Sequence, residues 1–299
     1  MRIPRIKLFV LALVAVAGAT ATVAIASPNR AADNRSAVQN AFTKTSKIAS
    51  GQFAFTVKIS GGGSSTISVA GTGGFDTKHK VSVVSVDLGP LSQVLGSAAG
   101  GVQIPATLQV VSIGNTAYVR LPSLASQVKK GAEWLKFDSA TVQKSLPGTV
   151  KTPATATTDP KQALKVLNAS ISVHKVGTAT VRGSSATHYL VTADVTKVVN
   201  GLVAKSDRAS TLKSLKAAGI KTVALDVYVD GSGLVRRVSG GLKSLKVQKG
   251  TPPVAVSVSI DLYSFGHTVK ATAPAASKTA DGAKLLEQLM AGLGNGTGG

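Results

Sequence analysis

The stretch VALDVYVDGSGLVRRVSG, residues 223–240, alternates between apolar side chains and side chains that are small or polar. Successive side chains of an extended chain point to opposite sides, so the alternation gives one apolar face. Asp-Gly-Ser-Gly at 230–233 is typical of a tight turn, and a second run carrying two arginines follows it. The stretch therefore predicts a β-hairpin whose apolar face needs a partner. On the first strand that face consists of Val223, Leu225, Val227 and Val229.

Residues 53–59 and 254–262 show the same two-residue period. The chain of 299 residues is rich in valine and threonine, which favour strands, and only 4% of it is aromatic. Its 31 glycines, many of them between these runs, indicate frequent turns. We expect about eleven antiparallel strands with four or five short helices, an α+β fold.

Two predicted helices matter for function. The spacing of Val38, Ala41 and Phe42 predicts a helix from Asp33 that ends at Gly51. Pro90 is suited to open a second, short helix inside a long connection between strands. Such a helix either fills a core or acts as a lid, and we assign it as a lid. Its apolar side consists of Leu91, Val94 and Leu95.

The N-terminal residues 1–26 have the parts of a secretory signal peptide: a basic start, an apolar run and a small-x-small ending. The run is nearly long enough to span a bilayer, so an uncleaved anchor is the alternative. Either way the protein is expected outside the cytoplasm, secreted or attached to the outer face of the cell membrane. Residues 275–299 are mostly small and polar, and they predict a flexible tail. Within it a short amphipathic helix is expected at Leu285, Leu286, Leu289 and Met290.

The composition offers few of the side chains that catalysis commonly uses. There is no cysteine, and the four histidines are not at metal-ligand spacing from one another or from a carboxylate. We expect neither a cofactor nor a metal, and no enzyme. A hydrolase remains an alternative if His174 or His188 meets a serine and an acid in a cleft.

The formal net charge of +21 predicts an anionic partner. Outside the cytoplasm that partner is a membrane surface or a phosphate-bearing wall polymer rather than nucleic acid. The basic residues do not form a run of five or more, so a solvated basic surface is the plainer interpretation.

A sheet with one apolar face has to bury it. The predicted helices are short, and their apolar sides are rich in alanine and valine. Two interpretations therefore stay open: a tightly packed core, or an under-filled sheet that leaves room for an apolar ligand.

Four stretches, in order, carry a resemblance to a known family. They are YVRLPSLASQVKKGAEWLKFD (118–138), VRGSSATHYLVTADV (181–195), VALDVYVDGSGLVRRVS (223–239) and VSIDLYSFGHTVKATAP (258–274). Together they resemble the LppX/LprG/LprA/LprF family of actinobacterial envelope lipoproteins. Members usually carry a lipidated cysteine just after the signal, where this chain has Ala26-Ser27-Pro28.

The resemblance implies a LolA/LolB-like fold over residues 27–274: a curved antiparallel half-barrel with helices covering its concave apolar face. It also implies a hydrophobic cavity for acyl chains. The expected cavity lining is Phe53, Phe55, Val57, Ile59, Val223, Leu225, Val227, Val229, Val256, Val258 and Ile260.

The leading hypothesis is a non-enzymatic, monomeric protein that binds and transports a lipid or glycolipid and meets an anionic membrane surface. The alternative is an envelope module with a filled core that binds anionic wall polymers or partner proteins.

Overall fold

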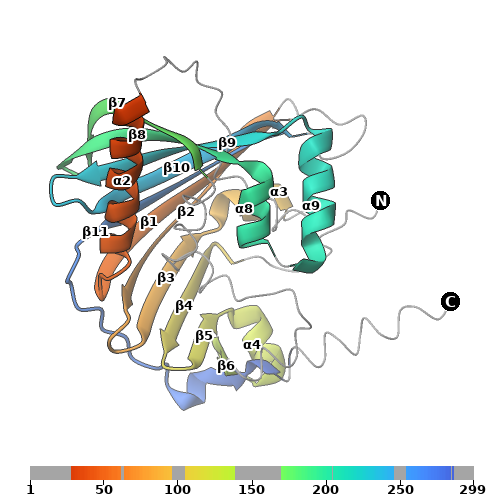
Figure 1. Ribbon diagram of the computed structural model, residues 1–299. Coiled ribbons are helices and arrows are strands. Elements are labelled where there is room, and N and C mark those ends of the chain that lie inside the picture. The colour runs from red at the N-terminus through yellow and green to blue at the C-terminus, as the bar shows by residue number, and fades with distance from the viewer. Residues whose placement is uncertain are drawn as a thin grey trace. The chain divides into compact units, whose positions relative to one another are not determined.

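The computed structural model describes residues 28–61, 64–95, 105–138, 170–203, 205–245, 254–283 and Leu285. Within them twelve strands form one sheet in the order β12-β6-β5-β4-β3-β2-β1-β11-β10-β9-β8-β7 (Figure 1). The α+β class and the large, mainly antiparallel sheet are confirmed, with twelve strands in place of about eleven. The strands are β1 (Ser50–Gly61), β2 (Ser64–Asp76), β3 (Val81–Asp87), β4 (Thr107–Ile113), β5 (Thr116–Arg120), β6 (Trp134–Asp138), β7 (Ser170–Val181), β8 (Ser184–Asp194), β9 (Thr222–Asp230), β10 (Val235–Leu245), β11 (Val254–Tyr263) and β12 (Thr279–Asp281).

Five α-helices and one short 3-10 helix accompany these strands in the described residues. None of them is both long and apolar enough to cross a membrane. The predicted signal peptide lies outside the described residues. The helices are α2 (Pro28–Thr45), α3 (Gly89–Leu95), α4 (Pro122–Val128), α8 (Val195–Leu202), α9 (Lys205–Ala217) and η1 (Ala276–Lys278).

The chain divides into two compact units. Unit 1 comprises the described parts of residues 1–48, 53–68 and 158–263. Unit 2 comprises the described parts of residues 49–52, 69–157 and 264–299.

In unit 1 the hairpin predicted at residues 223–240 is present. β9 and β10 pair antiparallel, and the amide of Gly233 donates to the carbonyl of Asp230 at 2.9 Å to close the turn. Gly233 has a φ of +73°, a left-handed conformation that glycine adopts without strain. The Asp-Gly-Ser-Gly signal therefore located both the turn and the two strands it joins.

Helices α2, α8 and α9 bury the apolar face of this sheet. α2 contacts β7, β9 and β10, and Figure 1 shows it lying across those strands. Val38, Ala41 and Phe42 of α2 face the sheet together because three- and four-residue spacing places them on one side of the helix. Helix and strand side chains form a common core, which includes Val38, Ala41, Phe42, Val173, Tyr189, Val191, Val198, Val199, Leu215, Val223, Leu225, Val227, Val229, Val235 and Leu242.

Local signals also define α8 and α9. The carboxylate of Asp194 accepts a hydrogen bond from the amide of Lys197 at 2.9 Å and caps the start of α8. After α9, Gly219 takes a φ of +73°, and the amide of Ile220 donates to the carbonyl of Leu215 at 2.9 Å. This is the geometry that ends a helix at a glycine, as the sequence indicated.

In unit 2, the part of β2 from residue 69 onward and β3 to β6 form an antiparallel meander, and β12 adds to β6 in parallel. α4 contacts both β6 and β12. A second core forms there from Ala125, Ala132, Leu135, Ala280 and Leu285. The flexible tail expected from residue 275 onward is therefore wrong for η1 and β12, because β12 completes the sheet.

The predicted end of the first helix is also wrong. α2 ends at Thr45, and Gly51 lies in β1 instead of capping the helix. A Cβ atom at Gly51 would lie 3.2 Å from the ring of Phe265 and 3.3 Å from that of Phe75. Gly51 therefore allows two aromatic rings to approach the strand, a packing role that looks the same in sequence as a helix stop.

Candidate functional site

The four predicted cavity residues of β9 lie in the filled core of unit 1. Val223, Leu225, Val227 and Val229 are between 0% and 7% exposed, under the helices that cover this face. They contact protein side chains. The prediction that they share one face is confirmed, whereas their role as cavity lining stays a prediction.

The predicted residues of β11 lie on the same face as those of β9. Ile260 is opposite Val238, which is in turn opposite Val227 and then Tyr189. Val256 packs against the core, and Val258 is 9% exposed. The structure thus brings the β9 and β11 residues together, toward the helices.

The predicted residues of β1 are less enclosed. β1 is the neighbour of β11 in the sheet. Phe53 is 5% exposed, whereas Phe55, Val57 and Ile59 are half-buried. Burial thus decreases along β1 away from Phe53.

Unit 2 contains an apolar row that the sequence analysis did not assign to the site. Val84 of β3 is opposite Val110 of β4, which is opposite Val119 of β5 and then Leu135 of β6. Beside it, Val86 is opposite Leu108. We call these residues the unit 2 apolar row: Val84, Val86, Leu108, Val110, Val119 and Leu135.

The two ends of the unit 2 apolar row differ in burial. Leu135 is fully buried where α4 and β12 meet β6. Val84, Val110 and Val119 are only half-buried, as are Val86 and Leu108. The sequence carried a signal for them, because valine or leucine recurs at every second position at 84–86 and 108–110. That signal is weaker than in β9, since Val83 and Val111 place apolar side chains on the opposite face too.

The predicted lid begins directly beside this row. α3 follows β3, and the carboxylate of Asp87 accepts a hydrogen bond from the amide of Gly89 at 2.9 Å. The amide of Leu88 donates to the carbonyl of Ala106 at 2.7 Å, which joins the start of α3 to the start of β4. Leu91 is half-buried. The side chains of the other two predicted lid residues, Val94 and Leu95, lie outside the described residues.

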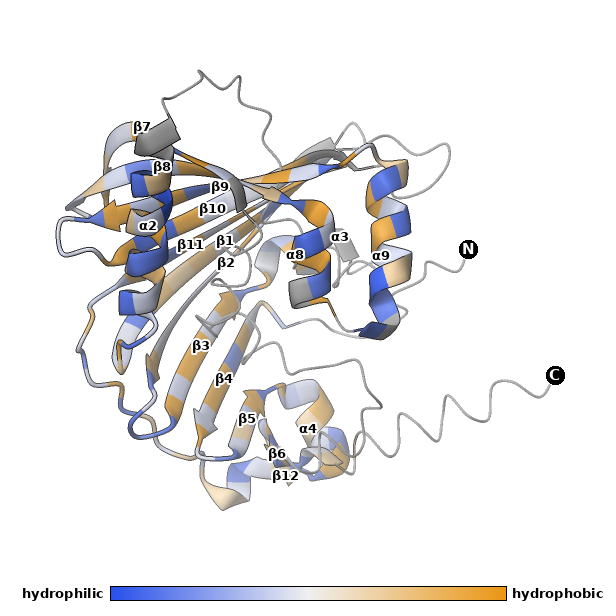
Figure 2. Cartoon of the chain, viewed as in Figure 1, coloured by the Kyte–Doolittle hydropathy of each residue, from blue (hydrophilic) through white to orange (hydrophobic). Residues whose placement is uncertain are grey.

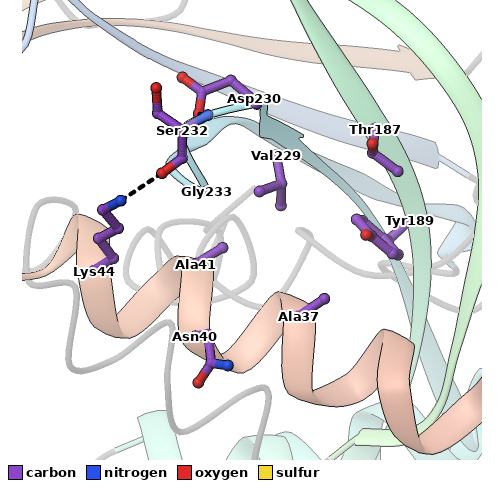
Figure 3. A pocket seen from close by; sticks show the side chains of 11 residues that line it. Ala37, Asn40, Ala41, Lys44, Thr187, Tyr189, Val229, Asp230, Ser232 and Gly233 are labelled. Atoms are coloured by element: carbon purple, nitrogen blue, oxygen red, sulfur yellow. Dashed lines mark hydrogen bonds between the residues drawn. The ribbon is translucent and has the colours of Figure 1, made fainter.

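A cleft of about 330 Å³ opens in unit 1 between α2 and the β9–β10 turn (Figure 3). The side chain of Lys44 lines the cleft, and its Nζ donates a hydrogen bond to the carbonyl of Ser232 at 2.6 Å. Tyr189 is 9% exposed, and burial raises the pKa of its hydroxyl, so it is neutral at physiological pH. Of the predicted cavity residues, Val229 is the one found among the described lining. The lining is Ala37, Asn40, Ala41, Lys44, Thr187, Tyr189, Val229, Asp230, Gly231, Ser232 and Gly233.

Asp230 is a fixed anion at the edge of this cleft. Its carboxylate accepts hydrogen bonds from the amides of Ser232 and Leu234, both at 2.9 Å, and from Nε of Arg236. Burial alone would raise the pKa of Asp230, but these donors outweigh burial and hold the pKa below its ordinary value. The carboxylate therefore stabilises the turn as an ion and is not placed to exchange protons near neutral pH.

A polar row crosses the opposite face of the same sheet. His188 is opposite Tyr228, which is opposite Arg237 and then Asp261. Nε2 of His188 lies 2.7 Å from Oδ1 of Asp226, and its ring stacks on Tyr228 with centroids 4.5 Å apart. Burial, and then the charge of Asp226, raises the pKa of Tyr228.

This polar row does not form a hydrolytic triad within the described residues. His188 has an acidic partner there but no serine hydroxyl at its second ring nitrogen. His174 is half-buried on β7, and no ion pair among the described residues involves it. No group of three or more histidine and acidic side chains is arranged to hold a metal in the described residues.

Comparison with known proteins gives one curated relative and a set of solved structures. The chain is 31% identical over 167 residues to an uncharacterized 31.2 kDa protein in the rplA-rplJ intergenic region of Streptomyces griseus. The match covers 53% of this chain, and the chain spans about half the length of that relative, 51%. No family model matches the chain.

The matched solved structures include two mycobacterial proteins. LppX, a lipoprotein of Mycobacterium tuberculosis, is 12% identical with a TM-score of 0.45, over 81% of this chain and 99% of LppX. LprF of Mycobacterium bovis is 11% identical with a TM-score of 0.47, over 82% of this chain and 98% of LprF. Both names also occur in the family that the four sequence stretches resemble.

Proposed function

We propose that this protein binds and transports a lipid or glycolipid in the bacterial cell envelope, without catalysing a reaction. The acyl chains lie against the apolar face of the sheet. The observation that carries the proposal is the unit 2 apolar row, which is sealed at Leu135 and only half-buried over β3 to β5. The resemblance of the four sequence stretches supports the same assignment.

The row suits an acyl chain chemically. Its described side chains on β3 to β5 are valines and a leucine, which offer neither a charge nor a hydrogen bond. Burial of each methylene group contributes about 0.8 kcal/mol, so ten methylenes contribute about 8 kcal/mol before the costs of ordering the chain. α3, which starts beside Val86 and Leu108, is the proposed lid over the bound chain.

The filled core of unit 1 favours a second candidate. The strongest apolar strand, β9, is closed by helices and needs no ligand to bury it. If unit 2 is equally closed in solution, the protein is an envelope module that binds anionic wall polymers or partner proteins through its basic surface. This candidate predicts salt-sensitive binding and no bound lipid.

Native mass spectrometry distinguishes the two candidates. The protein is the full chain from Ser27, because β12 and Leu285 complete the core beside β6, and it is purified without detergent. We expect a lipid-mass adduct, either co-purified or formed with added phosphatidylglycerol. Absence of any adduct contradicts lipid carriage.

The variant Val110→Asp tests the row itself. A carboxylate on the half-buried face has to be desolvated against the acyl chain, so the fraction of lipid-bound protein should fall at least tenfold. Val111→Asp is the matched control, since residue 111 is adjacent, also half-buried and on the opposite face. Equal loss in both variants would show that the lipid does not lie on the face of Val110.

A further inference from the structure

Five lysines gather on α8, α9 and the segment that follows α9. All five side chains are exposed: Lys197, Lys205, Lys213, Lys216 and Lys221. Within the described residues none of them forms an ion pair with a carboxylate. We call this set the α8–α9 lysine face.

Helical geometry places three of these lysines on one side of α9. At about 100° per residue, Lys213 and Lys216 lie about 80° and 20° around the helix from Lys205. The buried residues Thr211 and Leu215 lie on another side and face the core. The three lysine side chains are exposed, although Leu212 on the same part of the helix packs partly against the core. Figure 2 shows hydrophilic and hydrophobic residues alternating along α9.

The other two lysines adjoin this stripe. The amide of Val195, at the start of α8, donates to the carbonyl of Lys221 at 3.1 Å. Lys197 is two residues further along α8, and Lys221 comes just after the glycine that ends α9. The five charges thus belong to one end of unit 1 and not to scattered positions.

Few acidic residues accompany these lysines on α8 and α9. Asp194 uses its carboxylate to cap α8, and Asp207 is half-buried in the first turn of α9. Arg208 adds a sixth cation, although its Nε donates to the carbonyl of Val203 at 2.9 Å.

Elsewhere in the described residues many basic side chains are engaged by oxygen atoms. Arg182 and Arg237 bind Asp261, Arg120 and Lys278 bind Glu133, and Arg236 binds Asp230. Lys44 and Lys129 donate to backbone carbonyls. Other lysines, among them Lys58, Lys78 and Lys175, are also exposed without an ion pair in the described residues. The α8–α9 lysine face differs because five such ammonium groups gather on neighbouring elements.

We propose that the α8–α9 lysine face docks the protein on the anionic headgroup surface of a phospholipid bilayer. The proposal rests on the function proposed above, because a lipid carrier has to meet a bilayer in order to collect or deliver its lipid. Each lysine near an anionic bilayer contributes about a fivefold gain in binding, and salt screens the attraction.

The test uses the chain from Ser27 and vesicles made of equal parts phosphatidylglycerol and phosphatidylcholine, with phosphatidylcholine vesicles as the neutral reference. We expect binding to the anionic vesicles that weakens with added salt. The triple variant Lys205→Gln, Lys213→Gln and Lys216→Gln should bind about a hundredfold more weakly. Circular dichroism and thermal unfolding check that the variant is folded.

A control variant separates docking from overall charge. Lys58→Gln, Lys78→Gln and Lys175→Gln remove the same charge from exposed positions outside this face and should weaken binding by less than about threefold. Equal losses in the two variants, or no binding by the unmodified protein, overturn the proposal. Stronger binding to soluble polyphosphate than to the vesicles, through the same three lysines, also overturns it and indicates a wall polymer.

A second readout keeps this test separate from the proposed function. The lipid adduct in native mass spectrometry, recorded without vesicles, should be unchanged in the α9 triple variant. A normal adduct without vesicle docking contradicts only the docking face. Vesicle docking without an adduct contradicts the carrier function, on which the proposed role of docking rests.

Discussion

Asp261 shows how a single buried charge holds several strands together. It is 8% exposed on β11 and accepts hydrogen bonds from Arg237 at 2.5 and 2.8 Å and from Arg182 at 3.0 Å. Arg182 comes from the β7–β8 turn, where its φ of +47° is uncommon for a residue other than glycine. The guanidinium of Arg182 also lies 4.2 Å from the ring centre of Tyr263. One carboxylate therefore connects β10, β11 and the turn between β7 and β8.

Asp261→Asn should lower the free energy of unfolding by about 1 to 2 kcal/mol, since two guanidinium groups lose their anion but are a third or more exposed to solvent. Urea unfolding measures the change. Asp33→Asn, on an exposed carboxylate of α2, is the control and should have almost no effect. A loss below about 0.5 kcal/mol in Asp261→Asn would mean that solvent replaces the carboxylate at no cost.

The contact between Asp261 and its two arginines also predicts that the stability of the protein depends on pH. Burial alone would raise the pKa of Asp261, but Arg237 and then Arg182 outweigh burial and hold it below its ordinary value of 3.8. The ionised carboxylate thus stabilises the folded protein fully above pH 3.8, and this contribution is lost as the pH falls through the folded-state pKa. The difference in free energy of unfolding between the unmodified protein and Asp261→Asn, measured by urea unfolding, should therefore become smaller at low pH.

At the scale of elements, a few polar contacts fix α2 on the sheet. The hydroxyl of Thr45 accepts a hydrogen bond from the amide of Val235 at 2.9 Å and donates to the carbonyl of Ala41 at 2.7 Å. Lys44 donates to the carbonyl of Ser232 beside it. The last turn of α2 is thereby attached to the start of β10.

Thr45→Val should destabilise the protein by about 1 to 2 kcal/mol, because the buried amide of Val235 loses its acceptor while the side-chain volume is kept. Chemical unfolding of the variant measures the effect. Thr43→Val, exposed on the same helix, is the control. An unchanged midpoint would indicate that water reaches the Val235 amide.

The elements differ in how well the sequence predicted them. The β9–β10 hairpin was predictable because period-two alternation and the Asp-Gly-Ser-Gly turn agree. The position of α2 was not, since the apolar stripe of Val38, Ala41 and Phe42 shows that one side is buried but not which strands bury it. The unit 2 apolar row was missed because Val83 and Val111 add apolar residues to the opposite face and blur the alternation.

At the scale of the whole chain, residues distant in sequence complete each unit. β12 pairs in parallel with β6, with Ala280 opposite Leu135. A three-residue strand carries too little pattern to be recognised in a sequence of small and polar residues, which is why a flexible tail was expected.

A chain that stops after Pro274 should lose hydrogen-exchange protection in residues 134–138. It lacks β12 and Leu285, and removal of one buried leucine alone costs about 2 kcal/mol of apolar burial. A chain that ends after Met290 keeps both and should exchange as the full chain does. Equal protection in the two truncated chains would mean that α4 alone seals β6.

The attachment of α2 to β10 also sets the order in which the protein matures. Thr45 and Val235 are 190 residues apart, so the N-terminal helix is synthesised long before the strand that receives it. At about 5 to 20 residues per second, the helix waits about 10 to 40 s for that partner. During this interval the last turn of α2 lacks the strand that receives it, so this part of unit 1 is completed only after β10 has been made.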